Sequence, residues 1–225
     1  MTMVVGVSPD RRGTAELDLA AMLARSAADD LILCTIVPSP WPPSPAKVDA
    51  EYRAELERVA KEALEVARAQ MPADISAATL VRPAHSVPAG LLEVAEEHDA
   101  RAVVVGSSST GAFGRVALGS VSDWLAHSSP ILIALPPRGY RCPPDRRVTR
   151  ITVAYGGSEG GDDLVVGAAG VAARVGASLR LASFAVRPRP PYTSGVGTEA
   201  DRAMIEQWAQ ELESAAGARW AGSVR

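Results

Sequence analysis

The chain contains few of the residues that bind metals or form disulfides. Its 225 residues include only two cysteines, Cys34 and Cys142, and three histidines, His85, His98 and His127. Neither set has the spacing of a metal site, and two cysteines so far apart do not make the disulfide framework of a secreted protein. We therefore expect both thiols to be inert and each histidine to be solvated or to cap a helix.

Long apolar runs and an excess of positive charge are also missing. No apolar stretch approaches the ~18 residues of a membrane helix, and the N-terminus, MTMVVGVSPD, lacks the regions of a secretory signal. The net charge is −3, whereas a dedicated nucleic-acid binder normally has a basic surface. These features predict a cytoplasmic protein that binds neither membranes nor nucleic acid. The apolar fraction of 47% is high enough for a globular core.

Apolar strands alternate with helical segments in the first part of the chain. After two N-terminal strands joined by a helix, the pattern predicts strands at Ile75–Val81, Ala102–Val105 and Ile131–Leu135 and helices at Asp49–Gln70, Val87–His98 and Ser120–His127. Regular alternation of this kind is typical of an α/β protein, in which a parallel sheet is covered by helices on both faces.

The segment Val103–Pro137 combines two strands with a glycine-rich loop. Gly106 ends one apolar strand, and Gly119 and Ser120 open a short helix that leads into strand Ile131–Leu135. Glycine lets the backbone approach a ligand, and the N–H groups at a helix N-terminus attract anions. The pattern favours a phosphate site, although such a loop after a buried strand is often only a connection.

The sequence also repeats itself at an offset of 148 residues. Met3–Ile36 aligns without a gap with Ile151–Phe184, and both copies then enter a proline-rich loop. A helix is expected next in each copy, the second at about Glu199–Ala215. The second copy contains no counterpart of Gly106–Leu135, so we expect it to form only the first half of a domain.

The loop motif resembles the nucleotide-binding signature of the universal stress protein family. It reads Gly106-x-x-Ser109-x9-Gly119-Ser120, followed by Val121 and Ser122, whereas the family motif reads Gly-x-x-Gly-x9-Gly-Ser/Thr. The resemblance implies a five-stranded parallel sheet of order 3-2-1-4-5 with helices on both faces, followed by a partial second copy. It also implies a homodimer through strand Ile131–Leu135.

In that family the motif holds the ribose and phosphates of ATP, at the switch point between strands one and four. The residues implied here are Val7, Ser8, Pro9, Val37, Gly106, Ser108, Ser109, Gly119, Ser120, Val121 and Ser122. Two of them depart from the family pattern, because Ser109 replaces a glycine and Ser8 replaces the Asp at the tip of strand one. We therefore expect ATP to bind weakly or not at all. Asp10 is interpreted as a turn residue.

The expected organisation is a complete universal stress protein domain at 1–137, a linker at 138–150 and half of a second domain at 151–225. The leading hypothesis is a non-catalytic stress-response or signalling module that binds ATP weakly in the first domain. One alternative is an ATP-hydrolysing or adenylating enzyme of a related α/β fold. The other is an interaction protein whose nucleotide site has decayed. No general base or metal-binding acid can be assigned to the Gly106 loop from the sequence, so we expect no enzymatic activity.

Overall fold

The computed structural model describes residues 1–10, 14–39, 47–108, 112–155 and 161–183, with a few positions between 203 and 214. The chain divides into two compact units, Met1–Arg147 and Val148–Arg225. Ser109 and most of the helix expected at 199–215 lie outside the described residues. The positions described within 203–214 are helical.

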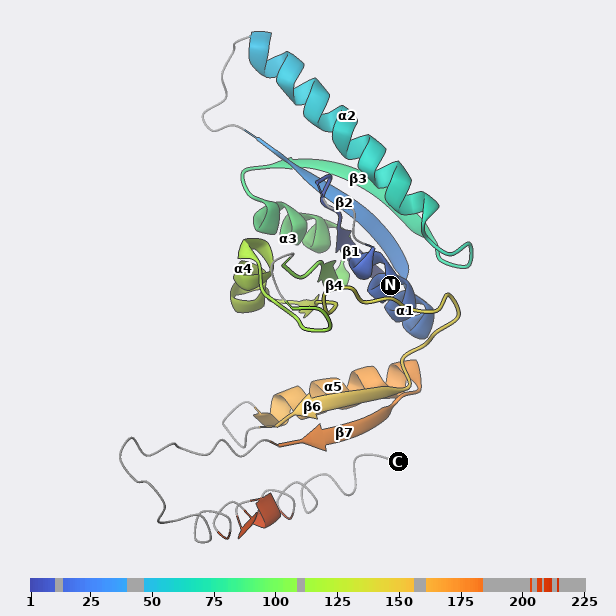
Figure 1. The fold of residues 1–225 in the computed structure, drawn as a ribbon, viewed down its shortest axis with the longest axis vertical. Coiled ribbons are helices and arrows are strands. Elements are labelled where there is room, and N and C mark those ends of the chain that lie inside the picture. Colours follow the sequence, from blue (N-terminus) through green and yellow to red (C-terminus); the bar gives the residue numbers. More distant parts are fainter. Residues whose placement is uncertain are drawn as a thin grey trace, which may run out of the picture. The chain divides into compact units, whose positions relative to one another are not determined.

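The first unit is a five-stranded parallel sheet of order β3-β2-β1-β4-β5, as predicted (Figure 1). Its elements are β1 (Thr2–Gly6), α1 (Ala15–Ala27), β2 (Asp30–Pro38), α2 (Lys47–Ala69), β3 (Ala77–Ala84), α3 (Val87–Glu97), β4 (Ala100–Val105), α4 (Ser120–Ser128) and β5 (Leu132–Ala134). The third strand extends further than predicted because it pairs with β2 as far as Pro38. Among the described residues, no helix is long and apolar enough to cross a membrane.

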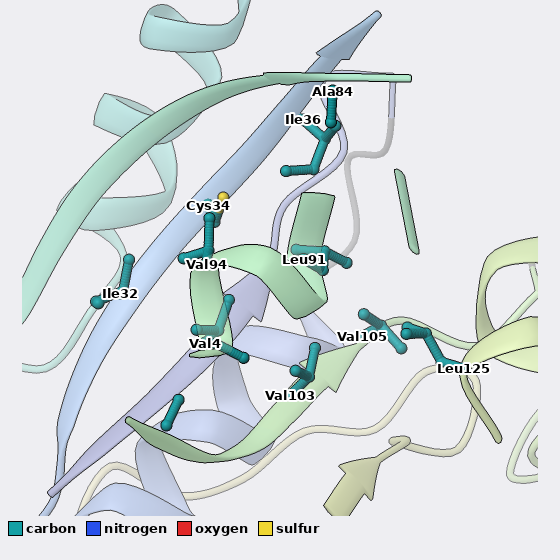
Figure 2. Close-up of a cluster of buried hydrophobic side chains, with 12 residues drawn as sticks. Val4, Ile32, Cys34, Ile36, Ala84, Leu91, Val94, Val103, Val105 and Leu125 are labelled. Atoms are coloured by element: carbon teal, nitrogen blue, oxygen red, sulfur yellow. The ribbon is translucent and has the colours of Figure 1, made fainter. Parts of the chain in front are cut away.

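The three central strands bury side chains on both faces of the sheet. Val4, Cys34 and Val103 belong to one core cluster, which α3 and α4 cover with Leu91 and Leu125 (Figure 2). The alternate positions of the same strands form the opposite cluster with α1 and α2; its central members are Met3, Val5, Leu31, Leu33, Ala102, Val104, Leu17 and Leu64. Strands buried on both faces read as continuous apolar runs, which is why the sequence predicted them correctly.

Helix α3 packs very close to the sheet at Gly90. A Cβ atom at this position would lie 2.7 Å from the Cβ of Ala84 and 2.9 Å from Cδ1 of Ile36. Glycine is therefore required here for close packing rather than for an unusual backbone angle. This approach brings the first turns of α3 to the carboxyl ends of the strands, where Val87 and Leu91 reach the candidate site.

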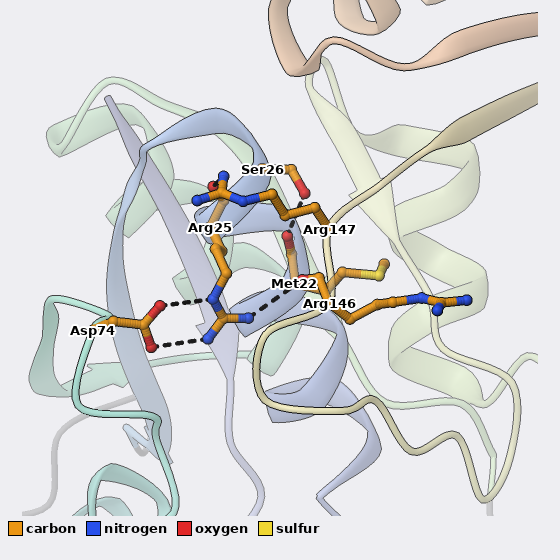
Figure 3. A network of polar contacts seen from close by, with 6 residues as sticks. All are labelled: Met22, Arg25, Ser26, Asp74, Arg146 and Arg147. Atoms are coloured by element: carbon orange, nitrogen blue, oxygen red, sulfur yellow. Dashed lines mark hydrogen bonds and ion pairs between the residues drawn. The ribbon is translucent and has the colours of Figure 1, made fainter.

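Residues that follow β5 pack against α1 and belong to the first unit (Figure 3). Arg25 is the centre of this contact, and its side chain is only 6% exposed. Its Nε and Nη2 donate to the two carboxylate oxygens of Asp74, at 2.6 and 2.9 Å, and its Nη1 donates to the carbonyl of Arg146. The guanidinium of Arg147 in turn donates to the carbonyl of Arg25. Part of the segment expected to be a linker therefore contributes to this fold.

The second unit reproduces the beginning of the first. Its described elements are β6 (Arg150–Ala154), α5 (Gly161–Val175) and β7 (Ser178–Ala182), and β6 pairs with β7 in parallel. Arg150 pairs with Ser178 as Thr2 pairs with Asp30, so the offset of 148 residues holds for the register of the strands as well as for the sequence.

The Arg25–Asp74 pair predicts a pH-dependent contribution to stability. Hydrogen bonds from Arg25 hold the pKa of Asp74 below its ordinary value of 3.8. A carboxylate with a lowered pKa stabilises the fold above its ordinary pKa, and this contribution is lost as the pH falls through the lowered value. We expect Asp74→Asn to lower the Tm at pH 7 and this difference to shrink below about pH 3.8.

The measurement is calorimetric unfolding of the full chain between pH 2 and 7. Asp10→Asn is the matched control, because Asp10 lies in an exposed turn. A Tm at pH 7 that Asp74→Asn leaves unchanged would contradict the stabilising role of the pair.

Candidate functional site

The carboxyl end of β1 is held in place by the neighbouring strand β2. The N–H of Val7 donates to the carbonyl of Cys34 at 2.8 Å, and the hydroxyl of Thr35 donates to the carbonyl of Val7 at 2.9 Å. Thr35 is 1% exposed. Both polar groups of Val7 are therefore bonded, which fixes the direction of the turn that follows. A single hydroxyl within the apolar run of β2 was the sequence signal for this role.

The second wall of the site is the N-terminus of α4. Gly119 is the N-cap residue, and its N–H donates to Oγ of Ser122 at 2.8 Å. The same Oγ donates back to the carbonyl of Gly119 at 3.1 Å. Ser122 is 2% exposed and closes the cap. The N–H groups of Ser120 and Val121 have no carbonyl partner within the helix, because the N–H groups in the first turn of any α-helix lack an intrahelical acceptor.

The loop between β4 and α4 is held at both of its ends. The N–H of Ser108 donates to the carbonyl of Ala117 at 2.6 Å. Further along the loop, the guanidinium of Arg138 lies over the ring of Phe113, 4.6 Å from its centroid, and the N–H of Arg138 donates to the carbonyl of Arg115 at 2.9 Å. The chain after β5 therefore supports the loop that faces the site.

The turn, the loop and the helix N-terminus enclose a cavity of about 210 Å³. It is lined by Gly6, Val7, Ser8, Pro9, Glu16, Cys34, Ile36, Val87, Leu91, Val105, Gly106, Gly119, Ser120, Val121 and Ser122. The cavity lies at the carboxyl ends of β1 and β4, where the strand order reverses and open α/β sheets bind ligands.

The structure brings together most of the residues expected at this site. Eight of those residues line the cavity, namely Val7, Ser8, Pro9, Gly106, Gly119, Ser120, Val121 and Ser122. Val37 is 7% exposed in β2 and does not line the cavity. Ser108 lies beside Gly119 and does not line the cavity either. Ser109 is outside the described residues.

Glu16 is the most informative lining residue that the sequence motif missed. It belongs to the first turn of α1 and is only 6% exposed. Together with Val7, Ser8 and Pro9 it also lines a second cavity of about 470 Å³ between α1 and α2. An acidic residue in the first turn of a helix is common because it interacts favourably with the helix dipole, so no sequence pattern assigned Glu16 to a site.

Cys34 brings a thiol to the wall of the cavity. Its side chain is fully buried, and this burial raises the pKa of the thiol to about 12. A thiol in such a state stays protonated near neutral pH and behaves as an apolar lining group. Among the described residues, no three side chains of the His, Cys, Asp or Glu type come together in a way that could hold a metal ion.

The family model described as the universal stress protein family matches residues 1–134. The chain belongs to the universal stress protein family. A universal stress protein of Mycobacterium tuberculosis is 40% identical over 215 residues, which cover 94% of this chain and 73% of that protein.

A solved structure of the family shows the same fold. The universal stress protein UspA from Lactobacillus plantarum is 18% identical, with a TM-score of 0.50 over 60% of this chain and 97% of that chain. Another match, with 18% identity and a TM-score of 0.43, is the universal stress protein from Archaeoglobus fulgidus in complex with dAMP; it covers 60% of this chain and 97% of that chain.

The two cysteines are expected to differ in reactivity. With a pKa of about 12, Cys34 has on the order of one thiolate in ten thousand at pH 8, and it is buried as well. Cys142 is partly exposed. Brief treatment of the native protein with iodoacetamide at pH 8 should therefore modify Cys142 before Cys34, as measured by peptide mass spectrometry. The urea-unfolded protein is the control, in which both should react, and early modification of Cys34 in the native protein would contradict its assignment as a buried, protonated group.

Proposed function

We propose that the first unit binds an adenine nucleotide and acts as a non-catalytic stress-response or signalling module in the cytoplasm. The observation that carries this proposal is the cavity at the N-terminus of α4, which is lined by the glycines and serines of the family motif. Two free cysteines, Cys34 and Cys142, agree with a reducing compartment.

The two sides of the cavity differ in their chemistry. The N–H groups of Ser120 and Val121 lie at the positive end of the α4 dipole, which favours the phosphates of a nucleotide. The opposite wall is apolar, because Ile36, Leu91 and Val105 supply side chains that suit a purine base. A volume of about 210 Å³ is smaller than the ~300–1,000 Å³ of most small-molecule pockets, which supports weak binding.

The lining of the cavity supports binding rather than turnover. Of its described residues, Glu16 and Cys34 carry ionisable side chains, and the Cys34 thiol is protonated at neutral pH. Phosphoryl transfer depends on groups that neutralise developing charge, usually a metal ion with a positioned base or arginine. The described lining residues include neither lysine nor arginine.

Calorimetry of the full chain with ATP and magnesium tests the proposal. We expect a Kd on the order of 10 μM or weaker. Gly119→Val should weaken binding at least tenfold, because Gly119 lines the cavity and a branched side chain adds bulk to its wall. This variant should still fold, since a Cβ at Gly119 would have no neighbour closer than 3.8 Å.

Gly167→Ala is the control, because Gly167 lies in α5 with open space around it. Absence of binding by the unmodified protein would favour the interaction protein with a decayed site. ATP turnover at about 1 s⁻¹ or faster would favour the enzyme alternative.

We also propose that the chain forms a homodimer through the edge strand β5. Leu132 on this strand is 59% exposed, whereas its neighbour Ile133 packs against the core. Phe113, Leu118 and Trp124, from the preceding loop and helix α4, are also large apolar side chains with high exposure. An unpaired edge strand with exposed apolar side chains is suited to pairing with a second copy.

Leu132→Lys should convert the dimer to a monomer, because it places a charge on the edge strand without disturbing the core. Multi-angle light scattering at micromolar concentrations measures the mass. Leu164→Lys is the matched control, since Leu164 is 55% exposed on α5. A monomeric unmodified protein, or a dimer that tolerates Leu132→Lys, would exclude this interface.

A further inference from the structure

We infer that Arg138 is a positioning residue for the nucleotide site, because the turn formed by residues 137–140 holds the loop between β4 and α4 in place. Release of this contact would weaken nucleotide binding, and a bound nucleotide would stabilise the contact. This role rests on the proposed nucleotide binding and adds to it a way in which that binding is controlled from outside the cavity.

Three contacts of Arg138 join the 137–140 turn to the β4–α4 loop. The N–H of Arg138 donates to the carbonyl of Arg115 at 2.9 Å, and its carbonyl accepts from the N–H of Gly114 at 3.0 Å. Its guanidinium lies over the ring of Phe113, 4.6 Å from the centroid, where the ring attracts a cation. Neither Arg138 nor Phe113 is among the described residues that line the cavity, so Arg138 acts on the cavity through the loop.

The turn that carries Arg138 has a defined backbone. The N–H of Tyr140 donates to the carbonyl of Pro137 at 3.0 Å. Gly139 has a φ of 76°, whereas Arg138 is not among the residues with positive φ. These angles describe a type II β-turn, which favours glycine at its third position. A Cβ at Gly139 would also lie 2.6 Å from Cδ1 of Phe113, so both the turn and the ring contact depend on this glycine.

The other side of the same turn is held on α1. The hydroxyl of Tyr140 donates to Sδ of Met22 at 3.3 Å. The guanidinium of Arg141 donates to the hydroxyl of Thr14, which precedes α1, and to Oδ2 of Asp18. Because α1 packs on the sheet, these contacts give the β4–α4 loop a fixed point of attachment.

The loop that Arg138 holds forms the phosphate side of the cavity. Gly106 and Gly119, at its two ends, line the cavity, and the N–H of Ser108 donates to the carbonyl of Ala117 within it. If the middle of the loop were released, part of the binding free energy would be used to order it again. A nucleotide that binds the ordered loop more tightly must also favour the Arg138 contact, because coupling between binding and conformation is reciprocal.

Calorimetry of the full chain with ATP compares two variants of Arg138. Arg138→Met removes the guanidinium and should weaken ATP binding about twofold to fivefold, which is the range for one exposed cation–π contact. Arg138→Pro removes the N–H as well and should weaken binding about tenfold, although proline suits the second position of a type II turn. Arg146→Met is the control, because Arg146 is exposed in the same segment and contacts Arg25 through its carbonyl.

Tryptic cleavage after Arg115 measures release of the loop directly. Arg115 is exposed, and its carbonyl accepts from the N–H of Arg138, so cleavage requires local opening of this contact. Arg138→Pro should accelerate this cleavage, and saturating ATP should slow it severalfold in the unmodified protein. Cleavage after Arg53, an exposed residue of α2, is the internal reference in peptide mass spectrometry. A contact that only supported the fold would leave cleavage after Arg115 insensitive to ATP.

The outcomes distinguish this role from the proposed function. If the unmodified protein binds no ATP, the proposed function fails and the role of Arg138 fails with it. If it binds ATP but Arg138→Pro binds ATP equally well, or if ATP leaves cleavage after Arg115 unchanged, only the positioning role is overturned. If Arg138→Pro does not fold, as judged by circular dichroism, Arg138→Met and the protection of Arg115 in the unmodified protein still decide.

Discussion

The position of β1 between β2 and β4 is the constraint on which the rest of the first unit depends. This strand is hydrogen-bonded on both sides and buried on both faces, with Val4 and Val5 both fully buried. Its carboxyl end is fixed further by Thr35, which bonds the carbonyl of Val7. Because the strand cannot shift without exposing both core clusters, the turn after it has a defined place. The cavity exists because this turn meets the N-terminus of α4 at the point where the strand order reverses.

Some polar groups at the cavity form the N-cap of α4, and others are available to a ligand. Ser122 is occupied by the N-cap, where it bonds both polar groups of Gly119. This leaves the backbone of Ser120 and Val121 to face an anion, so the motif serine at 122 acts by shaping the helix end. Glu16, in the first turn of α1, also lines the cavity. The end of a helix at which the N–H groups point outward carries a partial positive charge, which favours an anion at that side of the cavity.

The strands were predictable from local patterns, and their order and eight lining residues from the family resemblance, whereas the parts that come from distant segments were not. Continuous apolar runs such as Leu31–Val37 reveal buried strands, because burial on both faces leaves a local pattern. Gly106 and Gly119 could be assigned because the spacing of one loop resembles the family motif. Glu16 reaches the cavity only because α1 starts beside the β1 turn, and the contact of Arg146 with α1 is made through the buried Arg25. Such contacts join segments far apart in sequence, so no local period records them.

Comparison of equivalent residues in the two units distinguishes those that the fold needs from those that are found only at the cavity of the first unit. The bond from Val7 N–H to the Cys34 carbonyl has its equivalent in the bond from Tyr155 N–H to the Ala182 carbonyl, at 2.8 Å in both. Leu17 corresponds to Val165, and both are buried, so the helix covers its strands in the same register. Glu16 corresponds to Leu164, which is 55% exposed. The repeat has thus kept the hydrogen bonds and apolar contacts that place the turn, while the carboxylate is present only in the copy that carries the glycine motif.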